Sequence, residues 1–187
     1  MFKEAIAAYR PKNEQETVDQ AAMLAFIDNN PDCLLRSNLV AHLTASALVV
    51  DKTCKHVLFV YHTLYDSWSW VGGHTDGDGD LLRVALKEAR EETGVETITP
   101  YDEAILGLDV IHVTNHIKHG VYVPDHLHLN VTYLLVADRT APVQVKPDEN
   151  SAVRWFEIDT VCDFVSEDRM KPIYRKLFAA MRAKQGL

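Results

Sequence analysis

Three glutamates lie close together in the stretch 81–94, and they are the residues best suited to do chemistry. Glu88 precedes Glu91 by three residues and Glu92 by four, so on a helix the three carboxylates share one face. Like charges at these spacings destabilise a helix by about 0.2–0.5 kcal/mol per pair. A bound Mg²⁺ or Mn²⁺ would turn this repulsion into coordination, because hard cations bind several carboxylate oxygens. The alternative for this helix is a solvated acidic face.

A segment rich in glycine and aspartate, residues 72–80, leads into the acidic helix. Glycines let backbone atoms approach a ligand closely and permit positive φ angles. A loop of this composition before a helix N-terminus is suited to holding a metal ion and its phosphates. A flexible turn is the alternative, but the loop and the helix together favour a ligand site.

The remaining side chains of the acidic helix are expected to anchor it. Its apolar arc consists of Leu82, Ala85, Leu86 and Ala89. Lys87 and Arg90 flank the glutamates, and we expect them to point to the side rather than neutralise the carboxylates. Gly94 stands where a C′ glycine ends a helix.

Strands and helices are intermixed along the chain without strict alternation. The predicted helices cover 13–27 and 80–93, and a third begins near Ser166. The predicted strands cover 44–50, 56–63, 105–113, 126–137, 143–145 and 153–158. This pattern predicts an α+β fold of the α/β/α sandwich type, with a mixed β-sheet between helices and extra N- and C-terminal helices.

The strand 126–137 has the clearest alternation of apolar and polar residues. Its apolar side chains are Leu127, Leu129, Val131, Tyr133 and Leu135. Its other face carries His126, His128, Asn130 and Thr132. We expect the apolar face to pack on the core, and the two histidines to be available to a substrate.

Composition and charge restrict the class of protein. The chain has 187 residues, 47% of them hydrophobic and 25% charged, as expected of one globular domain over residues 1–187. The net charge of −8 argues against a nucleic acid polymer as the partner. Cys33, Cys54 and Cys162 show no metal-binding spacing and are expected to be reduced thiols. With no apolar run of membrane-spanning length and no signal-peptide pattern, we expect a cytoplasmic protein without a membrane partner.

The stretch 73–95 resembles the sequence box of the Nudix hydrolase family, G-x5-E-x7-R-E-U-x-E-E-x-G-U, in which U is a bulky aliphatic residue. With Gly73 as the first glycine, Glu88 falls on the glutamate of the R-E pair. Glu91 and Glu92 fall on the E-E pair, and Gly94 with the following valine matches the closing G-U. The segment 68–73, Trp-Ser-Trp-Val-Gly-Gly, is similar to the family's W-x-F-P-G-G lead-in.

Two positions depart from this pattern. Gly79 stands where the box has its first glutamate, and Lys87 stands where it has arginine. Lys87 keeps the positive charge but lacks the bidentate fork of a guanidinium. Asp78 or Asp80 is expected to replace the missing carboxylate. The aliphatic position of the box is only an alanine, Ala89.

The resemblance covers roughly residues 40–160 and implies a pyrophosphohydrolase that cleaves a diphosphate linkage in a nucleoside diphosphate derivative or a related small molecule. It implies Mg²⁺ or Mn²⁺ as cofactor, held by Glu88, Glu91, Glu92 and the Gly73 carbonyl. Family members often take a further acid from a later loop, for which Glu149 is the first candidate and Asp148 the second. The family often forms homodimers, but no segment of this chain argues for one.

Substrate contacts are less well determined by the sequence. The candidates are Trp68, Trp70, Lys87, His126 and His128. Each tryptophan could stack on a base, but core packing explains each at least as well. A neighbouring polar stretch contains His112, His116, Lys118, His119 and Tyr122. It forms either a wall that contacts the substrate or a solvent-exposed loop, and exposure is the preferred interpretation for its three histidines.

Two other functions remain open. An isopentenyl-diphosphate isomerase-like enzyme builds its metal site partly from histidines, and His42 with His74 resembles that arrangement. Such an isomerase needs a cysteine next to the position of Gly73, where this sequence has none. A non-catalytic domain that senses a nucleotide is the other alternative. Such regulators usually carry a DNA-binding helix beside a decayed box, whereas here no basic recognition helix is visible and the three glutamates remain.

Overall fold

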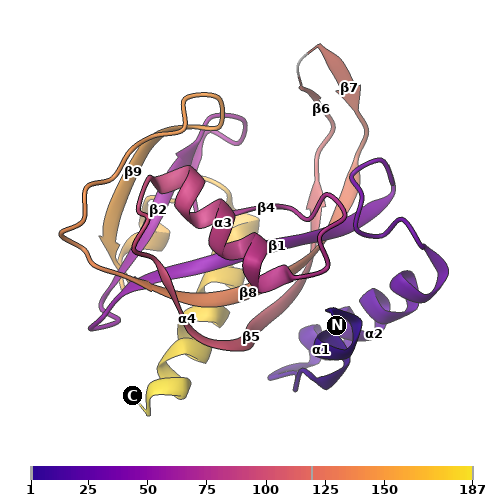
Figure 1. Cartoon of the computed structure of the whole chain (residues 1–187), viewed down its shortest axis with the longest axis horizontal. Helices are drawn as coiled ribbons and strands as arrows, with labels where there is room; N and C mark the ends of the chain where they lie inside the picture. The colour runs from indigo at the N-terminus through magenta and orange to yellow at the C-terminus, as the bar shows by residue number, and fades with distance from the viewer. Residues whose placement is uncertain (1, 119, 187) are drawn as a thin grey trace.

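A seven-stranded sheet forms the centre of the computed structural model, which describes residues 2–118 and 120–186 (Figure 1). Its strands are β1 (Ala41–Asp51), β2 (His56–His62), β3 (Ser67–Ser69), β4 (Val71–His74), β5 (Thr99–Val113), β8 (His126–Ala137) and β9 (Asn150–Glu157). The helices are α1 (Phe2–Ala8), α2 (Glu14–Asn29), α3 (Leu81–Thr93) and α4 (Lys171–Gln185). Two 3-10 helices cover Val161–Asp163 and Asp168–Met170.

The strand order is β3-β2-β1-β8-β5, with β4 paired to β1 and β9 paired to β2. β1 and β8 run parallel, and the other pairs are antiparallel. The long strand β1 therefore pairs with β8 along one edge and with β4 and β2 in succession along the other. The predicted mixed sheet is confirmed.

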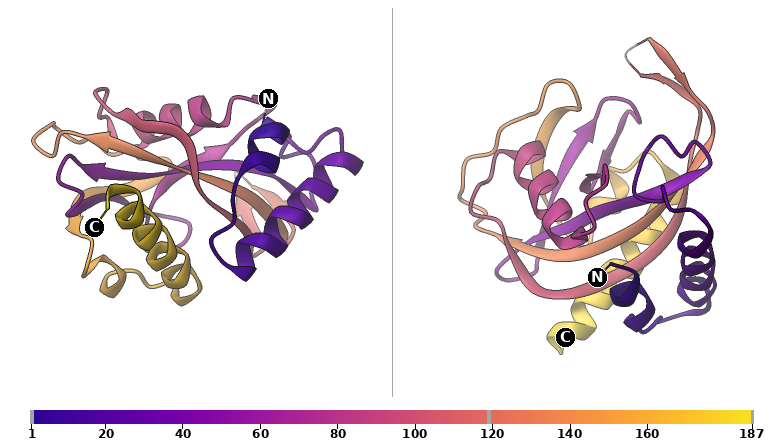
Figure 2. Two further views of the ribbon diagram at one scale, coloured as in Figure 1. Left: turned by 90° about the horizontal axis from the view of Figure 1, so that it is seen from below. Right: turned by 45° about the vertical axis from the view of Figure 1, so that its right-hand side comes forward.

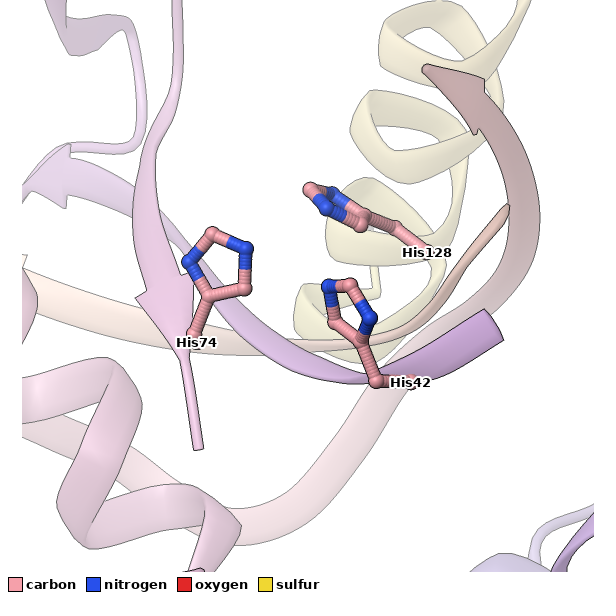
Figure 3. Close-up of side chains that lie close together, drawn as sticks. All are labelled: His42, His74 and His128. Carbon is pink, nitrogen blue, oxygen red and sulfur yellow. The ribbon is translucent and has the colours of Figure 1, made fainter. Parts of the chain in front are cut away.

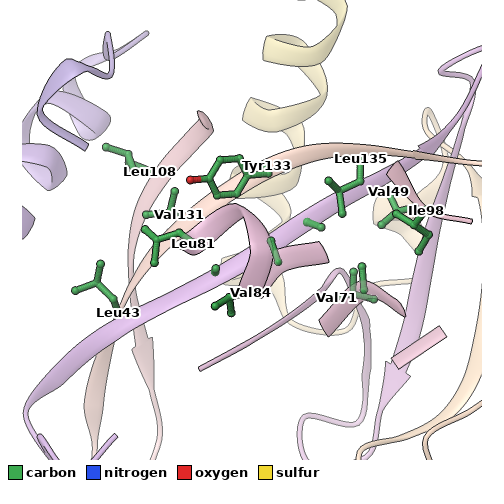
Figure 4. Close-up of a cluster of buried hydrophobic side chains, with 14 of the residues drawn as sticks. Leu43, Val49, Val71, Leu81, Val84, Ile98, Leu108, Val131, Tyr133 and Leu135 are labelled. Atoms are coloured by element: carbon green, nitrogen blue, oxygen red, sulfur yellow. The ribbon is translucent and has the colours of Figure 1, made fainter. Parts of the chain in front are cut away.

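Helices cover both faces of this sheet, with α3 on one side and α4 on the other (Figure 2). Alternate residues of β1 enter two separate cores. Leu43 and Val49 face the core under α3, where they join Val84 of that helix (Figure 4). Leu48 and Val50 face the core under α4. The α/β/α arrangement predicted from the sequence is confirmed; α2 packs against β5, and α1 packs against α2.

Helix α3 begins and ends on local signals that the sequence contains. The Asp80 side chain caps its N-terminus by accepting a hydrogen bond from the Arg83 amide at 3.0 Å. At the other end Gly94 has a φ of 69° and donates its amide hydrogen to the Arg90 carbonyl at 2.8 Å. The helix predicted over 80–93 is therefore confirmed. Its rigid attachment fixes where the three glutamates lie.

Two predicted elements differ in the structure. Residues 143–145 form no strand, because the Gln144 amide bonds to the Thr93 carbonyl at 2.7 Å instead of joining a ladder. The C-terminal helix begins at Lys171 rather than near Ser166. Both the amide and the hydroxyl of Ser166 bond to the 66–67 turn, at 3.0 and 2.8 Å, which holds the chain out of helical conformation there.

Several short elements were not predicted, among them strands β3 and β4, and residues 72–74 of the expected glycine-rich loop belong to β4. Helix α1 packs Ile6 into the core under α3. Strands β6 (His116–Lys118) and β7 (Val121–Val123) form a separate hairpin that projects from the body of the molecule (Figure 1). Among the described residues, no helix has the length and apolar character needed to cross a membrane.

Candidate functional site

The pairing of β1 with β4 and β8 gathers polar side chains on one face of the sheet. His42 is the register partner of His128, and Thr44 is the partner of both Asn130 and His74. Because residues two apart on a strand share a face, these side chains lie side by side. Asn130, on the same face of β8, is 1% exposed and accepts a hydrogen bond from Thr44 at 2.9 Å.

A cavity of about 670 Å³ lies over this polar face. The α3 glutamates and the 146–149 loop line one part of it, and histidines line another. Its basic side chains are Arg36, Lys87, Lys118, Lys146 and Arg169. Acidic and basic groups thus line a single cavity, which is large enough for a nucleotide-sized ligand.

Glycines of β4 allow the carboxylates of α3 to reach the cavity. The Gly72 amide donates a hydrogen bond to the Glu92 carboxylate at 2.8 Å. A Cβ on Gly73 would lie only 2.6 Å from the carboxyl carbon of Glu88. Any side chain at Gly73 would therefore displace Glu88, so the first glycine of the predicted site is required for the position of its first glutamate.

Glu92 is buried, with 3% of its surface exposed. Burial, and after it the nearby carboxylates of Glu149 and Glu88, raise its pKa to about 8, against the lowering effect of the Gly72 amide. A carboxyl with this pKa is mostly protonated at pH 7 unless a cation is bound beside it. A buried carboxyl whose ionised form is destabilised by neighbouring carboxylates is typical of a functional site.

Two lysines bridge the carboxylates. Lys87 Nζ lies 3.2 Å from Glu88 and 3.1 Å from Glu91. Lys146 Nζ lies 3.6 Å from Glu91 and 3.0 Å from Glu149. The expectation that Lys87 points to the side is wrong, because its stem is long enough to fold back over the acidic face.

Arg90 does point away, as expected, and donates to the Ile98 carbonyl at 2.8 Å. The two bridging lysines show that this cluster of oxygens attracts cations. Its oxygen donors are the carboxylates, and the backbone of Gly72 and Gly73 lies beside them. Mg²⁺ and Mn²⁺ prefer carboxylate and backbone oxygens as ligands. The residues present therefore fit a hard divalent cation.

Neither aspartate next to Gly79 replaces the missing glutamate of the box. Asp78 accepts from the Arg83 guanidinium at 2.7 Å, and Asp80 caps α3. Neither side chain lines the cavity. Gly79 itself lies against Phe2, whose ring would be 3.3 Å from an added Cβ.

The histidines form the second part of the cavity lining. The rings of His42, His74 and His128 have centroids 5.0 Å apart in each pair (Figure 3). Burial, followed by neighbouring basic groups, lowers the pKa of His74 and of His128 to about 2. Burial also lowers the pKa of His42. His74 and His128 are therefore neutral over the physiological pH range.

Of the two candidate tryptophans, only Trp70 lines the cavity, and its ring packs edge-on against Tyr174 with centroids 5.4 Å apart. Trp68 lies instead against Phe156, at 4.8 Å. His126 and Lys87 line the cavity as well.

Some residues of the polar stretch 112–122 line the cavity and others do not. His112, His116 and Lys118 line the cavity. Tyr122 is 62% exposed on the β6–β7 hairpin, and His119 lies outside the described residues.

Several cavity residues were not found from the sequence. Arg36 lies in the loop before β1 and donates Nε to Asp76 at 2.7 Å. Arg169 precedes α4 and donates to the His112 carbonyl at 2.7 Å. Lys146 lies in the loop that contains Glu149 and lines the cavity as well. No spacing rule joins these positions to the acidic helix, because they meet it only through tertiary folding.

Comparisons with known proteins bear on the fold and on the family of the chain. Residues 40–181 match the family model described as the NUDIX domain. The fold is similar to a C. elegans Ap4A hydrolase in a binary complex, with 18% identity, a TM-score of 0.54, and coverage of 76% of this chain and 98% of that chain. It is also similar to a MutT protein from Methanosarcina mazei Go1, with 16% identity, a TM-score of 0.55, and coverage of 78% and 96%.

A third similar structure is the E. coli dihydroneopterin triphosphate pyrophosphohydrolase, with 14% identity, a TM-score of 0.54, and coverage of 73% and 94%. No curated protein matches this chain in sequence. At these identities the structural likeness establishes the fold, and the family model covers most of the chain.

Proposed function

The chain belongs to the Nudix hydrolase family, and from that premise we propose that it hydrolyses a diphosphate linkage in a nucleoside diphosphate derivative or a related small molecule with a divalent metal ion. The metal ligands would be Glu88, Glu91, Glu92 and the Gly73 carbonyl. The general base would be Glu149.

One observation carries this proposal. Glu88, Glu91 and Glu92 of α3 and Glu149 of the 146–149 loop line one cavity, although that loop is far from α3 in sequence. Burial first, and then the carboxylates of Glu149 and Glu88, raise the pKa of Glu92, so a cation bound beside it would favour its ionised form. The two lysines supply some positive charge to the cluster, and a divalent cation would supply more.

Mg²⁺ or Mn²⁺ bound at these oxygens would neutralise the diphosphate and lower the pKa of the attacking water. Glu149 is suited to take the proton from that water. Lys146 holds its carboxylate at 3.0 Å, and the side chain is about one-third exposed to the cavity. A positioned carboxylate of this kind contributes typically 10²–10⁴-fold to the rate.

Basic side chains around the cavity would bind the phosphates. Arg36 and Arg169 line it from the loop before β1 and from the segment before α4. Lys118 lines it from the β6–β7 hairpin. Trp70 offers an aromatic surface to a base or sugar. These groups would orient an anionic substrate with its diphosphate toward α3.

The isomerase-like alternative has one feature in its favour and one against it. His42 and His74 do come together, as that alternative requires. Its cysteine is missing, because Cys33, Cys54 and Cys162 are buried and none lines the cavity. The hydrolase is the better supported function.

A panel assay tests the proposal. The protein with Mg²⁺ or Mn²⁺ would be incubated with nucleotide sugars, dinucleoside polyphosphates, NADH, ADP-ribose, oxidised nucleotides and isopentenyl diphosphate. Chromatography and ³¹P NMR would identify the phosphorylated products. We expect metal-dependent cleavage of a diphosphate linkage in at least one compound. Tight nucleotide binding without turnover of any compound would point to a sensor, and isomerisation of isopentenyl diphosphate would point to the alternative enzyme.

A further inference from the structure

Three histidines from three strands converge on one wall of the cavity, apart from the carboxylates of α3. His42 comes from β1, His74 from the end of β4 and His128 from β8 (Figure 3). One ring nitrogen from each lies within 4.8 Å of the other two. Parallel pairing of β1 with β8 makes His42 and His128 direct neighbours, and β4 adds His74 from the other edge of β1. We call these residues the histidine trio.

The ring of His42 is oriented by the backbone. Its Nδ1 lies 3.0 Å from the Asn38 carbonyl oxygen, which can only accept, so Nδ1 carries the hydrogen. The lone pair is therefore on Nε2. That nitrogen is buried and has no hydrogen-bond partner among the described residues. A buried acceptor without a partner is unfavourable, and a metal ion at the centre of the trio would satisfy it.

His128 is oriented in a similar way by His126. The His126 Nδ1 lies 2.8 Å from the Pro124 carbonyl oxygen and donates to it, which leaves its Nε2 as an acceptor. This Nε2 lies 3.2 Å from Nε2 of His128. When His128 donates to it, the other ring nitrogen of His128 keeps a free lone pair. Hydrogen bonds of this kind hold the rings of metal-binding histidines in place.

From these contacts we infer that the histidine trio is a second metal site, for a transition ion of the Zn²⁺ class, separate from the carboxylate site. Imidazole nitrogen suits Zn²⁺ and its neighbours, whereas Mg²⁺ prefers oxygen. Zn–N bonds are about 2.0–2.1 Å long, so the three nitrogens, now within 4.8 Å of one another, would draw closer together around one ion. The two sites would therefore select different ions within one cavity.

Three histidines leave a tetrahedral ion with one open position. The trio and the α3 glutamates line the same cavity, so this position would face a ligand held by the carboxylate site. An oxygen of an anionic group or a water molecule would occupy it. The inference goes beyond the proposed function and does not depend on it.

Cobalt provides the test, because Co²⁺ bound to nitrogen at four- or five-coordinate sites absorbs visible light far more strongly than octahedral Co²⁺. The full-length protein would be stripped of metal with a chelator and titrated with Co²⁺ in the presence of excess Mg²⁺. We expect an intense visible band that saturates at one equivalent and is removed by Zn²⁺. His74→Gln and His128→Gln should each weaken Co²⁺ binding on the order of 100-fold, and His126→Gln about 10-fold.

Two controls separate this site from the carboxylate site. His112→Gln removes an exposed histidine of the same cavity that is outside the trio, and Glu91→Gln removes a proposed ligand of the other site. Both should keep the Co²⁺ band, and near-UV circular dichroism would confirm that each variant is folded. The inference is overturned if wild-type protein shows no intense band, if the band survives in both trio variants, or if Glu91→Gln removes it.

Discussion

The carboxylate of Glu92 accepts a hydrogen bond from the Gly72 amide at 2.8 Å, and this contact joins the acidic helix α3 to the outer edge of β4. It places a buried acid next to Gly72 and Gly73, the second of which is the first glycine of the Nudix box. Because the amide is a single neutral donor, it only partly offsets burial, and the pKa of Glu92 stays near 8. Burial thus has a larger effect on the pKa of Glu92 than the hydrogen bond does, and the first prediction rests on this difference.

Binding of Mg²⁺ should release a proton from Glu92. With a pKa of about 8, the carboxyl holds its proton at pH 7, whereas a metal ligand must be ionised. Mg²⁺ affinity should therefore rise about tenfold per pH unit between roughly pH 6 and 8, then level off. Isothermal titration calorimetry at pH 7 in buffers of different ionisation enthalpy should report close to one proton released per bound ion.

The matched variants for this experiment are Glu92→Gln and Glu91→Gln. Each removes one carboxylate of the cluster, but only Glu92→Gln should abolish the proton release. Equal proton release in the wild type and in Glu92→Gln would show that another group titrates.

Alanine at the two adjacent glycines should have different effects. In Gly73→Ala the three atoms nearest to the new Cβ all belong to the side chain of Glu88, which can swing aside, so activity should fall at least about tenfold with little loss of stability. In Gly72→Ala it would lie 2.6 Å from the Cα of Ser46. That backbone cannot move away, so the free energy of unfolding should fall by about 1–3 kcal/mol.

Thermal unfolding and Mg²⁺-dependent turnover would be measured for both glycine variants. A Gly73→Ala protein that is as active as wild type would contradict the placement of Glu88 as a metal ligand.

Removal of Glu149 should affect the chemical step more than metal binding. Glu149→Gln keeps the size of the side chain but cannot accept a proton, so kcat should fall by about 10²–10⁴-fold. The Mg²⁺ affinity should change by only a few fold. Stopped assays across pH would show whether the acid limb of the rate profile is lost. Glu157→Gln, an exposed glutamate at the end of β9, serves as the control, and equal activity of the two variants would exclude Glu149 as the base.

The sequence predicted the parts of the site that lie on one element. Glu88, Glu91 and Glu92 share a helix face, so their convergence follows from helical geometry alone. Glu149 was placed in the site only through the family resemblance. The position of Lys87 was predicted wrongly, because the pattern of a helix gives the direction of Cβ but not the path of a long flexible side chain.

The histidine trio shows what sequence patterns do not contain. The alternation in 126–137 predicted that His126 and His128 share the strand with apolar residues of the opposite face. Nothing in the sequence predicted that β8 would pair in parallel with β1, or in which register. That pairing sets His128 beside His42, and it is decided by the packing of the whole sheet.

Replacement of the buried carboxylate tests the central claim most directly. Once the panel has identified a substrate, kcat/KM would be measured for wild-type protein and for Glu92→Gln at saturating Mg²⁺. Glutamine keeps the oxygen that accepts from Gly72 but removes the negative charge. We predict a fall of at least about 10²-fold in kcat/KM with a melting temperature no lower than that of wild type. Equal kcat/KM in the two proteins would contradict the assignment of the active site to the acidic face of α3.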